Sequence, residues 1–313
     1  MKRAFVFPGQ GSQAVGMGAD LAAAFPVARH VFQEVDDALS QKLSKVIFEG
    51  PEETLRLTEN AQPALMAVSL AVIRVIETEG NVKLADVAAF VAGHSLGEYS
   101  ALAAAGAFTL ADTARLLKAR GEAMQVAVPV GEGAMAALLG LEIDVAEAIA
   151  AEAAGDEVCD VANDNSEGQI VVSGNTAAVE RAVALAAEKG ARRSIILPVS
   201  APFHCALMEP AAAVMAEALA RTATSRPVPA VIANVTAEPV NDPDELRNLL
   251  VEQVTQRVRW RECVLKMKGL GVETLVETGA GKVLTGLTRR IDRELTGMAV
   301  GTPAEVEAFL KTL

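Results

Sequence analysis

The chain has 313 residues, with 28 Lys and Arg against 40 Asp and Glu, so its net charge is −12. That charge argues against nucleic acid as a partner, and no basic run offers contact with a membrane surface. Hydrophobic residues make up 51% and aromatic residues 4%, which is typical of a globular α/β enzyme and not of a disordered or fibrous chain. No apolar run has the length of a membrane span, and the first residues predict a strand and leave no room for a signal peptide.

The three cysteines, Cys159, Cys205 and Cys263, are scattered along the chain and lack the spacing of metal ligands. An odd and unclustered set is typical of a disulfide-free cytoplasmic protein. We therefore expect a cytoplasmic chain without a metal site.

In chain order, short apolar strands alternate with amphipathic helices over residues 1–127 and again over 200–313. This alternation predicts one large α/β domain whose parallel sheet is covered by helices on both faces. The expected strands are Ala4–Phe7, Val87–Ala92, Ala230–Ile232 and Thr274–Val276, and the expected helices are Ala64–Thr78, Leu110–Ala127, Ala206–Thr222 and Asp244–Val254.

Residues 128–199, between these two segments, follow a different order. Their pattern predicts strand, helix, strand, strand, helix and strand, which is the βαββαβ order of a ferredoxin-like subdomain. Prolines and a glycine bound the segment, so we expect a small subdomain inserted into a discontinuous large domain. The expected elements are Ala134–Leu141, Asp144–Ala154, Val158–Ala162, Gln169–Val172, Thr176–Lys189 and Arg192–Val199.

Within the large domain, an apolar strand runs into Gly-His-Ser-Leu-Gly at residues 93–97 and then into a small-residue helix. This order predicts a nucleophile elbow, which exposes Ser95 on a sharp turn between glycines that allow strand and helix to approach. The N–H of Leu96 would lie at the helix N-terminus, where it can donate to an oxyanion. The alternative is a tight turn without chemistry.

A serine nucleophile needs a base, and the chain has three histidines. His30 lies in a helical stretch of mixed polarity and is typical of a surface residue. His94 is in the elbow, where its ring must point away from the Oγ of Ser95. His204 follows a strand in a proline-bounded loop, where an α/β sheet delivers catalytic groups. An imidazole there could take the Ser95 proton and later return one, although a histidine without a role is the alternative.

Several motifs occur in a fixed order along the chain. They are Phe7–Gln13, Gly93–Tyr99, Arg120-Gly121, Asn163–Asn165 with Gln169, His204, and Gly281–Leu284. Together they resemble the malonyl-CoA:acyl carrier protein transacylases of fatty acid synthesis and the acyltransferase domains of polyketide synthases, over nearly the whole chain. The resemblance implies an α/β-hydrolase-like domain that carries a ferredoxin-like insertion.

The resemblance also implies roles for individual residues. Ser95 would be the acylated nucleophile and His204 its base. The backbone carbonyl of Gln253 would orient the imidazole in place of a carboxylate. The backbone N–H groups of Gln10 and Leu96 would form the oxyanion hole.

The same resemblance implies selectivity for malonyl groups. Arg120 would bind the free malonyl carboxylate with two parallel donors, whereas composition alone favours a solvated helix arginine. Phe203 would fill the space that the extra methyl of methylmalonyl requires. The other pocket residues implied are His94, Asn163, Asn165 and Gln169.

The predicted activity is a ping-pong transfer of malonyl from malonyl-CoA to the phosphopantetheine thiol of acyl carrier protein in fatty acid biosynthesis, without a cofactor. The alternatives are a malonyl transferase of a polyketide synthase or malonate decarboxylase system, a serine thioesterase or esterase, and an inactive scaffold that binds carrier protein. We expect a monomer. A local basic cluster would dock the carrier, and the last of three is preferred: Lys189/Arg192/Arg193, Arg257/Arg259/Arg261 and Lys282/Arg289/Arg290/Arg293.

Overall fold

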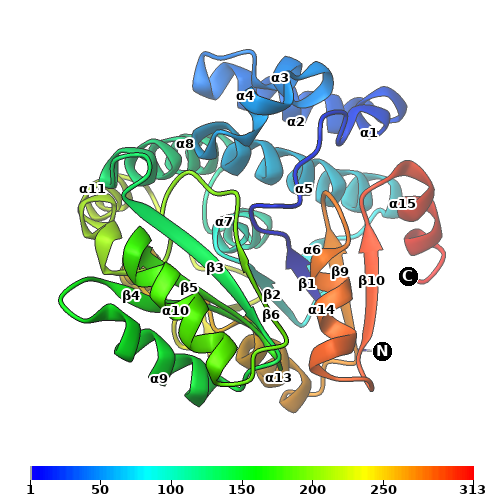
Figure 1. Ribbon diagram of the computed structural model, residues 1–313. Coiled ribbons are helices and arrows are strands. Elements are labelled where there is room, and N and C mark those ends of the chain that lie inside the picture. Colours follow the sequence, from blue (N-terminus) through cyan, green and yellow to red (C-terminus); the bar gives the residue numbers. More distant parts are fainter. Residues whose placement is uncertain (1) are drawn as a thin grey trace.

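The computed structural model describes residues 2–313 and arranges ten strands in two sheets (Figure 1). The larger sheet has the strand order β10-β9-β1-β2-β7-β8, and the smaller has the order β4-β5-β3-β6. The predicted mixed α/β architecture with a parallel sheet is confirmed. The strands are β1 (Arg3–Phe7), β2 (Phe90–Gly93), β3 (Gly133–Leu139), β4 (Cys159–Ser166), β5 (Gln169–Asn175), β6 (Arg193–Ile196), β7 (Val231–Ile232), β8 (Pro239–Val240), β9 (Thr274–Thr278) and β10 (Thr296–Val300).

The helices cover both faces of the larger sheet and one face of the smaller one. They are α1 (Ala19–Ala24), α2 (Pro26–Leu39), α3 (Leu43–Glu49), α4 (Glu52–Arg56), α5 (Thr58–Gly80), α6 (Leu84–Val87), α7 (Leu96–Ala104), α8 (Leu110–Ala127), α9 (Ile143–Ala154), α10 (Thr176–Glu188), the 3-10 turn η1 (Ala206–Met208), α11 (Glu209–Ala220), α12 (Pro243–Glu252), α13 (Trp260–Gly269), α14 (Val283–Ile291) and α15 (Pro303–Leu310).

The strands of the larger sheet are parallel except at one edge, where β8 runs antiparallel to β7. Side chains alternate between its faces with the period of two that a strand imposes. Phe5 and Phe7 of β1 join the core formed with α5 and α7, while Ala4 and Val6 pack with α13 and α14 on the other face. Both faces of the larger sheet are therefore buried against apolar side chains. Because β1 and β2 are parallel neighbours, their carboxyl ends lie side by side at one edge of the sheet.

Helix α5 differs from the expectation that no apolar stretch has the length of a membrane span. By length and composition it could cross a membrane, because an 18-residue window has a mean hydropathy of 1.3. However, 83% of that window is buried in the protein, where α5 packs against α2 and α8. Its apolar surface thus belongs to the core. The helix also begins before Pro63, although a proline usually marks a helix start.

The smaller sheet follows the chain order β3, α9, β4, β5, α10, β6, and its strand pairs are antiparallel. Helices α9 and α10 pack together on one face of it (Figure 1). Strand β4 runs to Ser166, beyond the expected end at Ala162. The extension was not expected because the run Asn163-Asp164-Asn165 is polar. Two register shifts interrupt the pairing of β4 with β5 there.

Two other bounds differ from expectation near the site. The residues before Ala88 form α6, so β2 begins only at Phe90, and β6 ends at Ile196. Pro198 and Pro202 cannot donate to a strand ladder, which leaves the stretch up to His204 as an irregular loop.

Candidate active site

Ser95 occupies the turn between β2 and α7 in a strained backbone conformation. Its φ of 55° is rare for a residue with a side chain. The flanking glycines allow the turn. A Cβ on Gly93 would lie 1.8 Å from the carbonyl carbon of Gly97, and a Cβ on Gly97 would lie 2.3 Å from the carbonyl oxygen of Phe7. The turn has the shape that the sequence predicts for an elbow.

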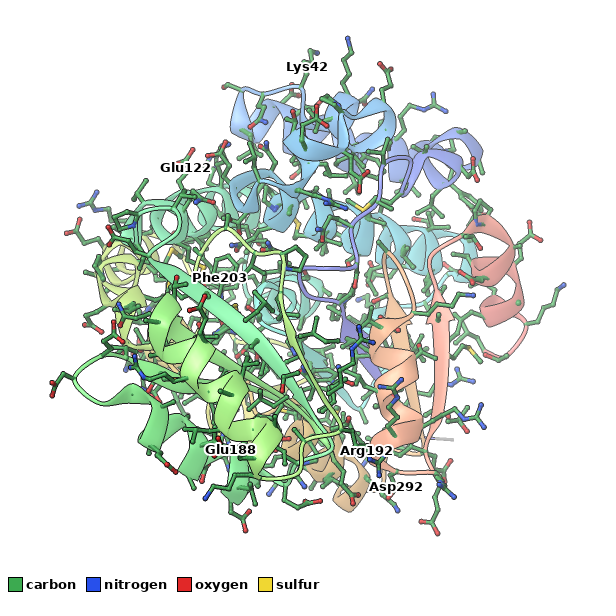
Figure 2. All side chains as sticks on the ribbon, in the orientation of Figure 1. Lys42, Glu122, Glu188, Arg192, Phe203 and Asp292 are labelled. Carbon is green, nitrogen blue, oxygen red and sulfur yellow. The ribbon has the colours of Figure 1, made fainter. Side chains whose placement is uncertain are left out.

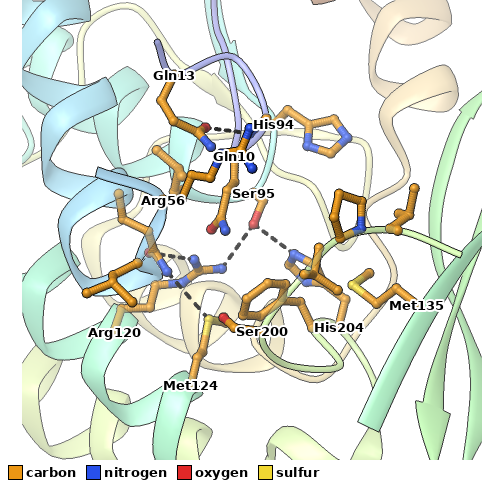
Figure 3. A pocket seen from close by; sticks show the side chains of 18 of the residues that line it. Gln10, Gln13, Arg56, His94, Ser95, Arg120, Met124, Met135, Ser200 and His204 are labelled. Carbon is orange, nitrogen blue, oxygen red and sulfur yellow. Dashed lines mark hydrogen bonds between the residues drawn. The ribbon is translucent and has the colours of Figure 1, made fainter. Parts of the chain in front are cut away.

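Ser95 and His204 form a hydrogen-bonded pair, shown in Figure 3. Oγ of Ser95 lies 2.7 Å from Nε2 of His204, and Nδ1 of His204 lies 2.8 Å from the backbone carbonyl of Gln253. Because a carbonyl oxygen can only accept, Nδ1 carries the proton and Nε2 presents a lone pair to the hydroxyl. Burial, together with the positive charge of Arg120, lowers the pKa of His204 to about 3. The neutral imidazole can therefore accept the serine proton near pH 7.

Arg120 reaches the same hydroxyl from α8, and it is only 1% exposed. Nη2 donates to Oγ of Ser95 at 3.2 Å and to Oε1 of Gln253 at 2.9 Å, while Nη1 donates to Oε1 of Gln62 at 2.8 Å. Both amide partners are neutral, and none of the ion pairs among residues 2–313 includes Arg120. Burial lowers its pKa, with Tyr99 and a carboxylate acting in the opposite direction. A buried cation without an ion-paired anion favours an anionic ligand, and the solvated arginine considered from composition is wrong.

A cavity of about 650 Å³ surrounds these groups. Gln10, in the loop after β1, and Leu96, the first residue of α7, both line it. The first N–H groups of a helix have no acceptor within the helix, so the N–H of Leu96 is available to an oxygen in the cavity. Oε1 of Gln10 accepts from the hydroxyl of Thr58 at 2.9 Å, which fixes the loop. Both expected oxyanion donors thus border the cavity that holds Ser95.

The wall beside the elbow combines residues from three segments. His94, Asn163 and Phe203 line the cavity. Nε2 of His94 lies 2.7 Å from Oδ1 of Asn165, and burial lowers the pKa of this imidazole. The His94 ring also faces Trp260, with ring centroids 5.7 Å apart. His94 is therefore held in place by its neighbours.

Comparison with known proteins agrees with this geometry. A family model described as "Acyl transferase domain" matches residues 4–302. The chain belongs to the acyl transferase family. The resemblance inferred from the motifs is confirmed.

Individual members of the family are similar over their full length. The malonyl CoA-acyl carrier protein transacylase of Bacillus subtilis (strain 168) is 45% identical, covering 100% of this chain and 97% of that one. The crystal structure of acyl-carrier-protein-S-malonyltransferase from Bartonella henselae has 57% identity and a TM-score of 0.97, covering 100% and 99%. A malonyl-transacylase solved in complex with its type II PKS acyl-carrier protein has 42% identity and a TM-score of 0.97, covering 100% of both chains.

Not every expected pocket residue reaches the cavity of this acyl transferase. Gln169 lies at the tight hairpin between β4 and β5, and its Oε1 accepts from Arg290 of α14 at 2.8 Å. It is therefore outside the cavity lining, and so is Asn165, which contacts His94 instead. His30 is exposed on α2, as the sequence predicts.

The expected docking clusters also lie outside the cavity lining. Among the described residues, the arginines and lysines that line the cavity are Arg56 and Arg120. In Figure 2, Arg192 and Asp292 lie near one edge of the molecule, well away from Phe203. Several members of the clusters pair with acidic side chains: Arg257 with Glu147, Arg259 with Glu262, Arg261 with Asp164 and Lys282 with Glu305.

Three polar residues of the site escaped the sequence reasoning. Gln62 bonds Arg120 from α5, and Asn234 accepts from the Ser95 N–H at 2.9 Å. Glu98 belongs to the elbow motif but had no role assigned. Asn234 is a polar residue among apolar neighbours in the sequence, and all three side chains are buried. A polar residue among apolar neighbours indicates a buried hydrogen-bond partner, but it does not identify that partner.

Over residues 2–313, no group of three or more His, Cys, Asp or Glu side chains is arranged to hold a metal ion. The three cysteines are free and buried.

Proposed function

We propose that this chain transfers a malonyl group from malonyl-CoA to the phosphopantetheine thiol of an acyl carrier protein, in fatty acid biosynthesis. One observation carries the proposal: Nε2 of His204 and the guanidinium of Arg120 both contact Oγ of Ser95, in one cavity. The names of the similar proteins support the substrate and the carrier.

In the first half-reaction, Oγ of Ser95 attacks the thioester carbonyl carbon while Nε2 of His204 takes the hydroxyl proton. The N–H groups of Gln10 and Leu96 stabilise the oxyanion, and one such donor is worth about 3 kcal/mol of transition-state stabilisation. The carbon–sulfur bond then breaks, and His204 gives its proton to the departing sulfur of coenzyme A. A malonyl ester on Ser95 remains.

The second half-reaction reverses these steps with another thiol. The phosphopantetheine thiol gives its proton to His204, and its sulfur attacks the ester carbonyl carbon. The bond to Oγ breaks, and Ser95 recovers its proton from the imidazole. The backbone carbonyl of Gln253 keeps a proton on Nδ1 of His204 throughout, because it accepts a hydrogen bond from that nitrogen. Only Nε2 therefore gains and loses a proton. His204 takes up and returns each proton in both half-reactions, and the proposal includes neither a cofactor nor a metal.

Acyl selection follows from the walls of the cavity. Arg120 offers a parallel pair of donors to the malonyl carboxylate, and a neutral acyl group leaves this buried charge unpaired. Phe203, 8% exposed, occupies the space of an additional methyl group. His94 and Asn163 complete the pocket, and Asn165 holds the His94 ring from outside the lining.

A polyketide role is the second candidate. One similar structure is a malonyl-transacylase in complex with a type II PKS acyl-carrier protein. The chemistry on Ser95 would be identical, and only the carrier would differ. A thioesterase or esterase is disfavoured because Arg120 would stand unpaired beside a neutral ester.

We also propose the organisation predicted from the sequence. Residues 1–127 and 200–313 would form an α/β-hydrolase-like domain, and 128–199 a ferredoxin-like subdomain. The sheet order β4-β5-β3-β6 with α9 and α10 on one face supports the second unit. The chain would act as a cytoplasmic monomer.

A transfer assay tests the function. Purified protein with malonyl-CoA and either a fatty acid or a type II polyketide carrier should load malonyl onto the phosphopantetheine thiol, with the parallel double-reciprocal lines of a ping-pong mechanism. Intersecting lines would argue against a covalent intermediate, and hydrolysis without transfer would favour the esterase. The preferred carrier separates the two candidates.

A further inference from the structure

Glu98 is a buried carboxylate that the steps above leave without a role. It lies one helical turn after Ser95 on α7, and it is 1% exposed. Its Oε2 accepts from Nε2 of Gln253 at 2.8 Å and from the backbone N–H of Asn234 at 3.1 Å. Both donors belong to residues that contact the reacting groups.

Gln253 connects Glu98 to the site. Its backbone carbonyl accepts from His204, its Oε1 accepts from Arg120 at 2.9 Å, and its Nε2 also donates to the carbonyl of Ser95 at 3.0 Å. The ends of this amide are not interchangeable, because a guanidinium only donates and a carboxylate only accepts. The ionised Glu98 favours the orientation in which Oε1 faces Arg120.

Asn234 connects Glu98 to the strained turn. Oδ1 of Asn234 accepts from the N–H of Ser95 at 2.9 Å, and Nδ2 donates to the carbonyl of Gly93 at 2.7 Å. A strained conformation persists only where its surroundings hold it. The hydrogen bond from the Asn234 N–H to Glu98 holds Asn234 in the position from which it makes these two contacts.

We propose that Glu98 is a positioning residue that holds Gln253 and Asn234, and through them the geometry of Ser95, His204 and Arg120. It acts on the guanidinium through a neutral amide, so Arg120 is fixed without being paired and remains open to a ligand carboxylate. This inference rests on the proposed function.

The protonation of Glu98 provides a readout that packing alone would not move. Burial raises the pKa of Glu98 to about 7, although its two hydrogen bonds and the charge of Arg120 act in the opposite direction. The other titratable groups that interact with it are Tyr99 on α7 and Cys263 on α13. Protonated Glu98 is a weaker acceptor, so acylation should slow below pH 7. The pKa of His204, about 3, lies well outside that range.

The test measures acylation by malonyl-CoA from about pH 5 to about pH 9 in the wild type and in Glu98→Gln, which keeps the volume and removes the charge. The control is Glu277→Gln on β9, a buried glutamate outside the cavity lining, whose carboxylate accepts from the N–H groups of Leu284 and Thr285. We expect kcat/KM at about pH 8 to fall roughly tenfold to a hundredfold in Glu98→Gln, as for other misplaced catalytic groups. The pH limb near 7 disappears in that variant and persists in the control.

Thermal unfolding separates positioning from folding. The folded-state pKa is raised from 4.5 to about 7, so ionisation of Glu98 lowers stability as pH rises through this window. Glu98→Gln should therefore melt no lower than the wild type at about pH 8. A lower melting temperature that accompanies the lost activity would make Glu98 merely structural and overturn the inference.

The kinetic outcomes also distinguish the two proposals. Unchanged acylation in Glu98→Gln, or a limb near pH 7 that persists in it, overturns the positioning role and leaves the proposed function intact. A wild type that malonyl-CoA does not acylate removes the proposed function itself.

Discussion

Nη2 of Arg120 lies 3.2 Å from Oγ of Ser95, so the buried positive charge and the hydroxyl face the same part of the cavity (Figure 3). An acyl group esterified to that oxygen must pass close to the guanidinium. Acyl selection and acylation therefore depend on the same few atoms, since a carboxylate on the acyl group can pair with a cation that makes no ion pair within the protein.

Replacing Arg120 with Ala should remove malonyl selectivity. We expect kcat/KM for malonyl-CoA to fall. The loss should correspond to roughly 2–5 kcal/mol of transition-state stabilisation, which is the usual cost of truncating one partner of a desolvated pair. Acetyl-CoA should gain relative to malonyl-CoA, because no buried charge is left unpaired. The matched control is Arg115→Ala, an exposed arginine on the same helix that pairs with Asp112. A variant that keeps the malonyl preference over acetyl would contradict this role.

Shortening Phe203 should admit a larger acyl group. Its ring lines the cavity, and Phe203→Ala opens the space that a methyl branch needs. We expect methylmalonyl-CoA to gain about 1–3 kcal/mol relative to malonyl-CoA, the range for one methyl group in a pocket. Competition between the two esters, read by mass spectrometry of the acylated protein, measures the ratio. An unchanged ratio would place the methyl group elsewhere.

The buried imidazole should make folding sensitive to acid. The pKa of His204 is lowered from 6.5 to about 3, so between these values the unfolded chain binds more protons than the folded one. The stability contributed by the neutral imidazole is present above pH 6.5 and is lost as pH falls toward 3.

Urea unfolding at about pH 7 and about pH 5 measures this effect. His204→Gln should lose less stability over the interval than the wild type, while His30→Gln on the exposed face of α2 should behave as the wild type does. Equal acid sensitivity in His204→Gln would mean that the folded protein already holds a charged imidazole.

Docking of the carrier should depend on charge near the cavity opening. Arg56 lines the cavity and pairs with the exposed Glu52, and its side chain is 65% exposed. The cluster with Arg289 and Arg290 does not line the cavity. We expect Arg56→Glu to raise the KM for an acidic carrier several-fold, about threefold to tenfold, and to flatten its salt dependence, because rim charges act mainly on encounter. Acylation by malonyl-CoA should change little.

The double charge reversal of Arg289 and Arg290 is the comparison variant. A larger effect from this pair than from Arg56→Glu would restore the docking site expected from the sequence. Equal loss of both half-reactions in Arg56→Glu would instead indicate damage to the site itself.

Local patterns predicted much of the fold. The helix Leu110–Ala127 has the bounds expected from its periodicity, and Thr109 caps its start. The turn at Ser95 follows from the close approach that Gly93 and Gly97 permit. By contrast, the start of α5 before Pro63 was missed, because tertiary packing outweighs the local cost of a proline.

The site could be predicted only in part, for a physical reason. Ser95 and His204 stand in recognisable local contexts, and motif resemblance added Arg120. The partners Gln62 and Asn234 have no local signature, since the parallel sheet and α5 bring them together from distant segments. Gln169 shows the converse, because the hairpin at its position turns it away from the cavity.

The covalent intermediate tests the central claim most directly. After brief exposure to malonyl-CoA, intact mass measurement should show one added malonyl group, peptide mapping should place it on Ser95, and Ser95→Ala should show none. An adduct mapped to another residue, or a wild-type protein that transfers malonyl without ever carrying it, would contradict the account.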